Sequence, residues 1–173
     1  MQHATMKMPS ADEVQIKALR QADLPDFASL MRYRHWRPDN AKPMEVAPEE
    51  AEAMFMATQD PRSGCYLWLI WAGQVAVGAV MMMPFFHNTC RHVGYWVAPS
   101  QHGKGYASAG LAEVSRIAFN ELNAARLQAL VQPDNPASLH VLEKNGFARE
   151  GLLEKADTKD GIPVDAYLYA RVK

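Results

Sequence analysis

The chain has 173 residues, of which 49% are hydrophobic and 21% charged, with a formal net charge of −1. This length and composition are typical of a soluble globular protein with a sizeable core, and the balanced charge argues against binding to nucleic acid or to a membrane surface. Because no apolar run reaches the ~18 residues of a membrane span and the N-terminus lacks a secretory signal, we expect a cytoplasmic protein.

The first third of the chain predicts a tail, a strand and two helices. Residues 1–13 show no periodic pattern, so we expect a flexible tail followed by a single domain over 14–173. Residues 14–20 alternate apolar and polar side chains, as a half-buried strand does. Apolar residues at helical spacing predict a helix over 22–32, and a first turn rich in Pro and Glu predicts another over 48–57.

The middle of the chain predicts strands and then a longer helix. Residues 65–71 and 74–83 are apolar runs that flank Ala72-Gly73, which is typical of a hairpin turn. Residues 91–98 predict a further strand. The stretch from about 106 to 122 has apolar residues along one helical face.

The last third predicts a strand, a short helix and two more strands. Residues 126–131 form an apolar run, and a helix over 136–145 is indicated by N-P before it and N-G at its end. Strands at 148–157 and 163–171 are joined by a D-G turn. The order β-α-α-β-β-β-α-β-α-β-β predicts an α/β (α+β) fold with an antiparallel meander ahead of a parallel crossover.

The turn H-G-K-G-Y-A at 102–107 lies between a predicted strand and a predicted helix. Glycines there expose backbone N–H groups at the positive end of the helix dipole, and Lys104 adds a positive charge, so the turn suits a phosphate. The alternative is a plain turn that needs positive φ. The spacing of a P-loop is absent, and the dinucleotide fingerprint fails at its third glycine, where Ser108 stands.

The stretch H-G-K-G-Y-A resembles the pyrophosphate loop of the GNAT superfamily of N-acetyltransferases, Q/R-x-x-G-x-G/A, with His102 as a departure at the first position. G-Y-W-V-A-P-S-Q-H-G-K-G-Y-A, R-L-Q-A-L-V-Q-P-D-N-P-A-S-L-H-V-L-E-K-N-G-F and D-G-I-P-V-D-A-Y-L-Y-A-R together look like the RimJ/RimL-type branch, the ribosomal-protein N-terminal acetyltransferases and their relatives. The specific likeness covers residues 91–171. It implies a mixed sheet of about seven strands, splayed into a V between two central parallel strands and flanked by about four helices.

The resemblance also implies a site for acetyl-CoA as cosubstrate, with no metal. Its pantetheine arm would lie between the strands that end near Val97 and Val131, and backbone N–H groups of residues 103–107 would hold its pyrophosphate. The residues assigned to acetyl-CoA are Trp96, Val97, His102, Gly103, Lys104, Gly105, Tyr106, Ala107 and Asn135.

The catalytic assignments come from the same resemblance. Ser138, in the N-P-A-S signature, would donate a proton to the leaving thiolate, and Asp157 would take the proton of the amine. Glu154 and His92 are the alternatives to Asp157. Each residue also has a structural interpretation: Asn135 suits a helix N-cap, Ser138 can satisfy a donor in the first turn, and Asp157 can be a solvated strand carboxylate.

Other chemically distinctive residues have plainer interpretations. The Tyr33-Arg34-His35-Trp36-Arg37 segment either lines the acceptor groove, where its arginines favour a carboxylate-bearing acceptor, or packs at the surface. Cys65 and Cys90 lie in apolar runs and are interpreted as reduced core thiols. The histidines and cysteines show no spacing typical of a metal site.

The sequence therefore predicts an acetyl-CoA-dependent N-acetyltransferase, in which a protein N-terminal amine or a small amine attacks the thioester directly. One alternative on the same fold is a non-catalytic sensor that binds acyl-CoA. A more distant alternative is a nucleotide-binding α/β protein. A homodimer is consistent with the habit of the family.

Overall fold

The structure is a computed structural model that describes residues 14–34 and 43–173; the tail expected at 1–13 lies outside the described residues. The strands are β1 (Val14–Ala18), β2 (Tyr66–Ala72), β3 (Val75–Phe85), β4 (His87–Val97), β5 (Arg126–Val131), β6 (Ala148–Lys159) and β7 (Ile162–Val172). The helices are α1 (Leu24–Met31), α2 (Pro48–Gln59), α3 (Tyr106–Asn120) and α4 (Pro136–Lys144), with short 3-10 turns η2 (Gln21–Asp23) and η3 (Pro99–Gln101).

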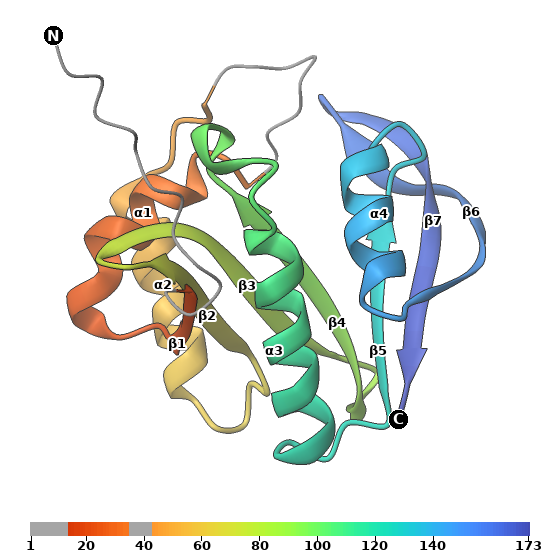
Figure 1. Cartoon of the computed structure of the whole chain (residues 1–173), viewed down its shortest axis with the longest axis horizontal. Coiled ribbons are helices and arrows are strands. Elements are labelled where there is room, and N and C mark those ends of the chain that lie inside the picture. The colour runs from red at the N-terminus through yellow and green to blue at the C-terminus, as the bar shows by residue number, and fades with distance from the viewer. Residues whose placement is uncertain (1–13, 35–42) are drawn as a thin grey trace, which may run out of the picture.

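The strands form one seven-stranded sheet in the order β1-β2-β3-β4-β5-β7-β6 (Figure 1). Only β4 and β5 pair in parallel, and every other neighbouring pair is antiparallel. The mixed sheet with four helices confirms the predicted fold class. No helix in the described part of the chain is long and apolar enough to cross a membrane.

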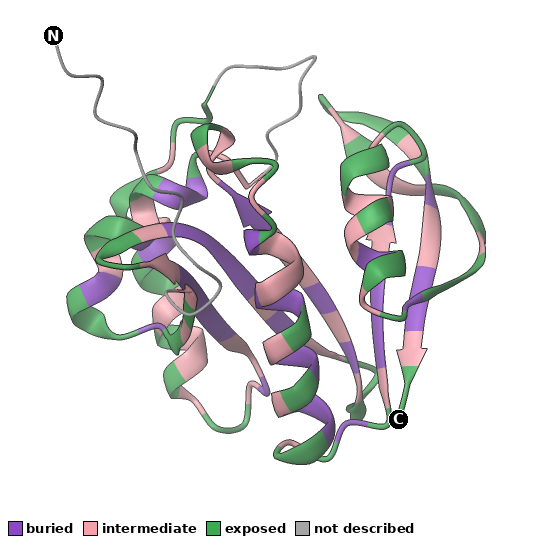
Figure 2. Ribbon diagram, viewed as in Figure 1, coloured by how far each residue is buried: buried purple, intermediate pink, exposed green. Residues whose placement is uncertain are grey.

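Each face of the sheet has its own hydrophobic core. On one face, Leu111 and Val114 of α3 and Leu142 of α4 pack against strand residues that include Val97 and Val131. The helices α1 and α2 cover the other face, where the core contains Trp96 of β4. Because side chains alternate along β4, neighbouring residues of this strand lie in opposite layers. Figure 2 shows the buried sheet between the helices.

The sheet opens between its two parallel strands. The ladder that joins β4 to β5 contains three residue pairs and ends where His92 lies opposite Gln128. Beyond that pair, β4 continues to Val97 and β5 to Val131, and the described residues form no further pair between the two strands. This opening confirms the predicted V-shaped splay.

The structure corrects the sequence analysis between the third and fourth strands. Both strands extend beyond their predicted ends, to a tight turn at Phe86, which has φ 61°. Pro84 still pairs with Arg91 at the base of this hairpin. Cys65 and Cys90 are free, as expected, but both are half-buried rather than core residues.

Candidate functional site

The glycine turn lies at the open end of the splay, between η3 and the first turn of α3. Gly103 and Gly105 have φ values of 75° and 81°, a region that favours glycine. A Cβ atom at either position would meet no atom within 4 Å, so the space around the turn is open. Both interpretations of the turn remain compatible with this geometry, because positive φ is required and the approach to the backbone is clear.

The start of α3 lacks a side-chain cap among the described residues. Gly105 is the N-cap of this 15-residue helix. The first N–H groups of a helix have no intrahelical acceptor, and the helix dipole adds positive potential there. Tyr106 sends its side chain into the core, so only its backbone can take part in binding an anion at this end.

Two side chains of the turn contact the preceding segments, His102 the end of β4 and Lys104 the 3-10 turn η3. His102 Nε2 lies 2.8 Å from the backbone oxygen of Val97, so this imidazole links the turn to the end of β4. Lys104 Nζ donates to Gln101 Oε1 at 2.8 Å. His102, which departs from the family pattern at the first loop position, therefore stabilises the turn.

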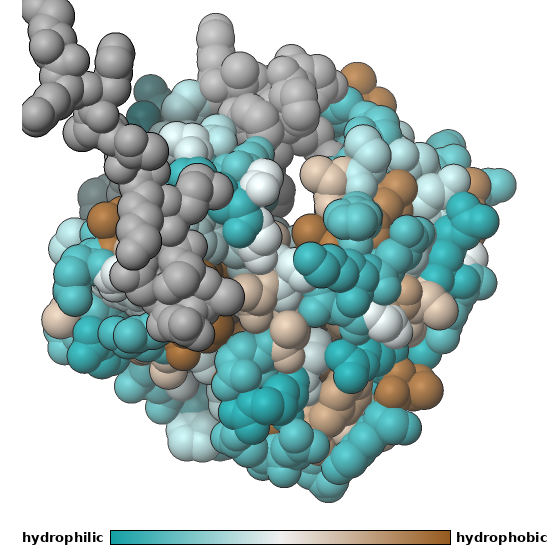
Figure 3. Space-filling view, viewed as in Figure 1, coloured by the Kyte–Doolittle hydropathy of each residue, from teal (hydrophilic) through white to brown (hydrophobic). Residues whose placement is uncertain are grey.

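The strand β4, which borders the splay on one side, packs against α1 through Trp96. Trp96 is buried beneath α1, and its indole Nε1 donates to the backbone oxygen of Leu30 at 2.9 Å. Its side chain thus packs in the core, while its backbone lies on the strand that borders the gap. Figure 3 shows the face with α3 and α4 as a mostly hydrophilic surface with hydrophobic residues between these two helices.

The N-P-A-S segment forms the first turn of α4 and contacts β4 across the splay. Asn135 Oδ1 accepts from the backbone N–H of Ser138 at 3.2 Å, which is the N-cap interaction that the sequence allowed. The Tyr95 hydroxyl donates to the Ser138 backbone oxygen at 3.1 Å and lies 2.9 Å from Ser138 Oγ. Burial raises the pKa of Tyr95 to about 12, an effect that the Ser138 hydrogen bond partly opposes.

Asp157 lies on β6 and is held by two hydrogen bonds. Its Oδ2 accepts from Gln132 Nε2 at 2.7 Å, and its Oδ1 accepts from the backbone N–H of Thr158 at 2.8 Å. Gln132 follows the last residue of β5, so this contact places the carboxylate beside the open end of the splay. Asp157 is half-buried, whereas Glu154 is exposed in the irregular part of β6.

His92 stands at the point where β4 and β5 separate. Burial lowers the pKa of His92, which favours the neutral imidazole that a general base requires. It is the last residue of β4 that pairs with β5. His92 therefore remains the alternative to Asp157 as the base.

Comparison with known proteins decides the family. The family model described as an acetyltransferase (GNAT) domain matches residues 13–148. The chain belongs to the GNAT acetyltransferase family.

Relatives within the family support this placement. The chain is 32% identical over 94 residues to the uncharacterised N-acetyltransferase YnaD of Bacillus subtilis, covering 54% of this chain and 55% of YnaD. It is 28% identical over 154 residues to spermidine N(1)-acetyltransferase of Escherichia coli, covering 84% and 78% of the two chains. The chain thus spans about half the length of the first curated relatives it matches.

A solved structure shows the same fold. RimL, the ribosomal L7/L12 alpha-N-protein acetyltransferase in complex with coenzyme A, superposes with a TM-score of 0.79 at 21% identity. The match covers 95% of this chain and 97% of the RimL chain.

Two site residues escaped the sequence analysis of this GNAT chain. Tyr95 was part of the quoted G-Y-W-V motif, but its contact with Ser138 joins residues 43 positions apart. Gln132 contacts Asp157 across 25 positions. Strand alternation places Tyr95 on the face of Val97, yet its partner on α4 is visible only in the fold.

The acceptor segment proposed at 33–37 is described only in part. Arg34 forms an ion pair with Glu50 of α2 at 2.9 Å, and its NH1 group lies 3.7 Å from Met54 Sδ. The guanidinium therefore contacts α2. Residues 35–37 lie outside the described residues.

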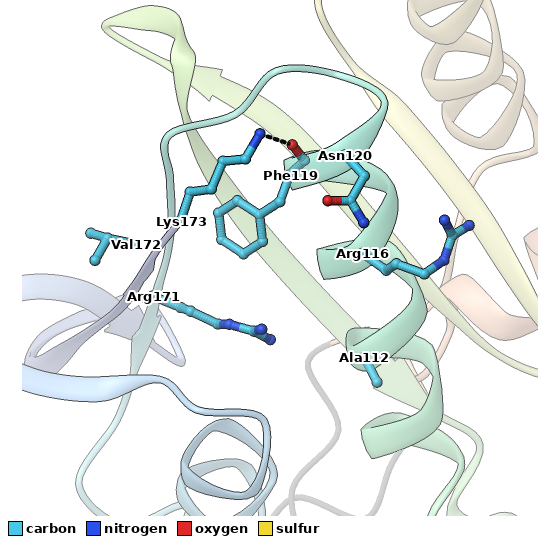
Figure 4. A pocket seen from close by; sticks show the side chains of 7 residues that line it. All are labelled: Ala112, Arg116, Phe119, Asn120, Arg171, Val172 and Lys173. Atoms are coloured by element: carbon cyan, nitrogen blue, oxygen red, sulfur yellow. Dashed lines mark hydrogen bonds between the residues drawn. The ribbon is translucent and has the colours of Figure 1, made fainter.

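A separate cavity of about 300 Å³ lies between the C-terminal half of α3 and the end of β7 (Figure 4). Its cations contact the protein itself: Arg171 lies over the Phe119 ring at 5.4 Å, and Lys173 Nζ donates to the Phe119 backbone oxygen at 2.7 Å. It sits far along α3 from the glycine turn. Over residues 14–34 and 43–173, no three His, Cys, Asp or Glu side chains are grouped as metal ligands would be.

Proposed function

We propose that this protein transfers the acetyl group of acetyl-CoA to an amine. The observation that carries the proposal is the splay between β4 and β5 beside a helix N-terminus that no described side chain caps. An extended pantetheine arm offers amide groups to strand edges that lack a neighbouring strand, and a pyrophosphate suits the N–H groups at the start of α3. Membership of the GNAT family and the coenzyme A complex of RimL support the same assignment.

The proposed chemistry is direct transfer. The ammonium form of the acceptor loses one proton to Asp157, and the resulting amine attacks the thioester carbonyl carbon. The C–S bond then breaks, the thiolate takes the proton of Ser138, and Ser138 regains a proton from the nitrogen of the new amide. The phenol of Tyr95 has one proton to donate. That proton goes to the Ser138 backbone oxygen, so the Ser138 hydroxyl, 2.9 Å away, donates to the phenol oxygen. We assign Tyr95 the role of holding Ser138 Oγ in position beside the splay.

The first test is binding. We expect acetyl-CoA and CoA, but not ATP or NAD, to raise the melting temperature. A ligand at 100 times its Kd adds about 2.7 kcal/mol to the free energy of unfolding, which is roughly 5–11 °C for a chain of this size. Stabilisation by ATP or NAD alone would instead favour the nucleotide-binding alternative.

A matched pair of variants localises the ligand. Gly105→Glu places a carboxylate at the start of α3 and should abolish the shift. Gly161→Glu, in the turn between β6 and β7, is the control, because Gly161 also has positive φ (79°) and open surroundings. A Gly105→Glu variant that keeps the full acetyl-CoA shift would refute the pyrophosphate site.

Turnover separates the enzyme from the sensor. The protein is incubated with acetyl-CoA and L-phenylalanine, spermidine or a peptide that begins with serine, and thiol release is measured. Spermidine and a protein N-terminus are chosen because they are the acceptors named for the relatives. Release that depends on one of these amines supports the transferase, whereas binding without release supports the acyl-CoA sensor.

A further inference from the structure

The side chain of Gln132 is buried and only half satisfied. Gln132 is 3% exposed, and its Nε2 donates to Asp157 Oδ2 at 2.7 Å. Its Oε1 is buried and has no hydrogen-bond partner within the described residues. An ionised carboxylate can only accept hydrogen bonds, so the amide must direct its NH₂ group toward Asp157. The flipped amide would place Oε1 against the carboxylate, so it does not give Oε1 a partner either.

A buried hydrogen-bond acceptor without a partner in the described residues indicates that a ligand supplies the donor. Buried polar atoms in native proteins almost always have a hydrogen-bond partner, and exceptions gather where a ligand or a function supplies the reason. Gln132 also lines a shallow cavity of about 380 Å³ together with residues of β6 and β7. Gln132 thus borders open space through part of its residue, while its Oε1 is itself buried.

Strand register places Gln132 at the splay, on the face opposite Ser138. His92 pairs with Gln128, so a continued parallel register would set Trp96 opposite Gln132. Trp96 belongs to the core beneath α1 and α2, whereas Val131, the neighbour of Gln132, belongs to the core beneath α3 and α4. Because side chains alternate along a strand, Gln132 follows the face of Trp96.

We propose that Gln132 holds the acceptor amine beside Asp157, an assignment that rests on the proposed transferase function. A primary ammonium has three N–H bonds. One proton passes to Asp157 and frees the lone pair that attacks the thioester, and a second passes to Ser138 after Ser138 has protonated the thiolate. The third N–H bonds Gln132 Oε1 and remains in the amide product.

This arrangement makes Gln132 a specificity residue. A secondary ammonium has two N–H bonds, and both are consumed in the reaction, so no N–H remains for Gln132 Oε1 in the product. A site built to bind a substrate N–H rejects an analogue without it far more strongly than a shape-selective pocket does. We expect the native protein to favour a primary amine over its N-methyl counterpart by at least about 100-fold in kcat/KM.

The test compares amines in native and variant protein. The probes are L-phenylalanine, spermidine and a serine-starting peptide, each beside the counterpart methylated on its reacting nitrogen. Gln132→Met keeps the volume and removes both hydrogen bonds, so we expect the preference for the primary amine to fall about tenfold or more. The control is Gln128→Met, since Gln128 is also buried on the same face of β5 and should leave the preference unchanged.

The kinetic constants, rather than the melting temperature, separate this role from a structural one. Gln132→Met also removes the hydrogen bond from Nε2 to Asp157 Oδ2, so a lower melting temperature is expected whatever the role of Oε1 and does not bear on the inference. The KM for acetyl-CoA should stay unchanged while that for the amine rises. A variant that loses kcat equally for both amines would show that Gln132 only supports Asp157 and would overturn the inference.

The failures are distinguishable. If the native protein binds acetyl-CoA but acetylates none of the probes, the proposed transfer fails and the role of Gln132 fails with it. If the native protein acetylates a probe and Gln132→Met keeps its preference, only the role of Gln132 is refuted.

Discussion

The contact between Tyr95 and Ser138 gives the sharpest quantitative prediction. Tyr95→Phe removes one hydrogen bond to Ser138 Oγ and one to its backbone oxygen, at 2.9 and 3.1 Å. Each neutral hydrogen bond contributes about 0.5–1.5 kcal/mol, and the half-buried serine regains some bonding to water. We therefore expect the free energy of unfolding to fall by about 1–2 kcal/mol at pH 7, roughly 2–8 °C in melting temperature.

The pH dependence of this loss has a definite sign. Burial raises the pKa of Tyr95 from 10.0 to about 12. Below pH 10 the phenol is protonated in both states, so its full stabilisation is present. As pH rises from 10 to 12, the unfolded chain ionises first and stability is lost, by about 1 kcal/mol at pH 11 and about 3 kcal/mol once both states are ionised.

The assay is urea unfolding of the native and Phe proteins at pH 7, 9 and 11. The deficit of Tyr95→Phe should shrink toward zero at pH 11, because only the native protein carries this titration. Other tyrosines ionise in both proteins and cancel. Tyr167→Phe is the control, since the Tyr167 hydroxyl forms no hydrogen bond with the described residues and its loss should cost less.

Two results would refute the reasoning. A deficit that is equal at pH 7 and pH 11 would mean that the folded protein does not hold the phenol neutral. A double-mutant cycle with Ser138→Ala measures the bond itself, and a coupling energy below about 0.3 kcal/mol would mean that the two hydroxyls do not interact.

The remaining predictions concern the base and the packing of α3. Asp157→Asn should lower kcat/KM for the amine by about 10²–10⁴-fold, as loss of a general base does, while the thermal shift with acetyl-CoA stays intact. Full activity of the Asp157→Asn variant would refute Asp157 as the general base and favour His92 instead. Gly110→Ala should destabilise the protein by about 1–2 kcal/mol in urea unfolding, because overpacking outweighs the gain in helix propensity. Its Cβ would lie 2.7 Å from Ile70 Cδ1 and 3.0 Å from Val80 Cγ2, and an unchanged midpoint would mean that these side chains yield freely.

The elements that the sequence predicted well carry local signals. The cap residues before and after α4 placed this helix at 136–145, against Pro136–Lys144 in the structure. The turn between β3 and β4 was missed because it uses Phe86 at φ 61°, where no glycine or asparagine marks the reversal. The length of the β3–β4 hairpin follows from the pairing of the two strands. The periodicity of a single strand carries no information about its partner.

The candidate site divides in the same way. The glycine turn is a local feature, since positive φ and a helix start can be inferred from six consecutive residues. Tyr95 and Gln132 are candidate site residues because of their hydrogen-bond partners on α4 and β6, respectively. Neither residue type is unusual in a strand, so only the assembled sheet distinguishes them.

The short ladder between β4 and β5 also divides the molecule. One part contains β1 to β4 with α1, α2 and α3, and the other contains β5 to β7 with α4; three residue pairs join their strands. Side-chain bonds such as Asn145 Nδ2 to Ser108 Oγ, at 3.0 Å, span the remaining boundary. A molecule bound along the splay would act as a missing eighth strand, so that its binding and the cooperative unfolding of the two parts become one coupled equilibrium.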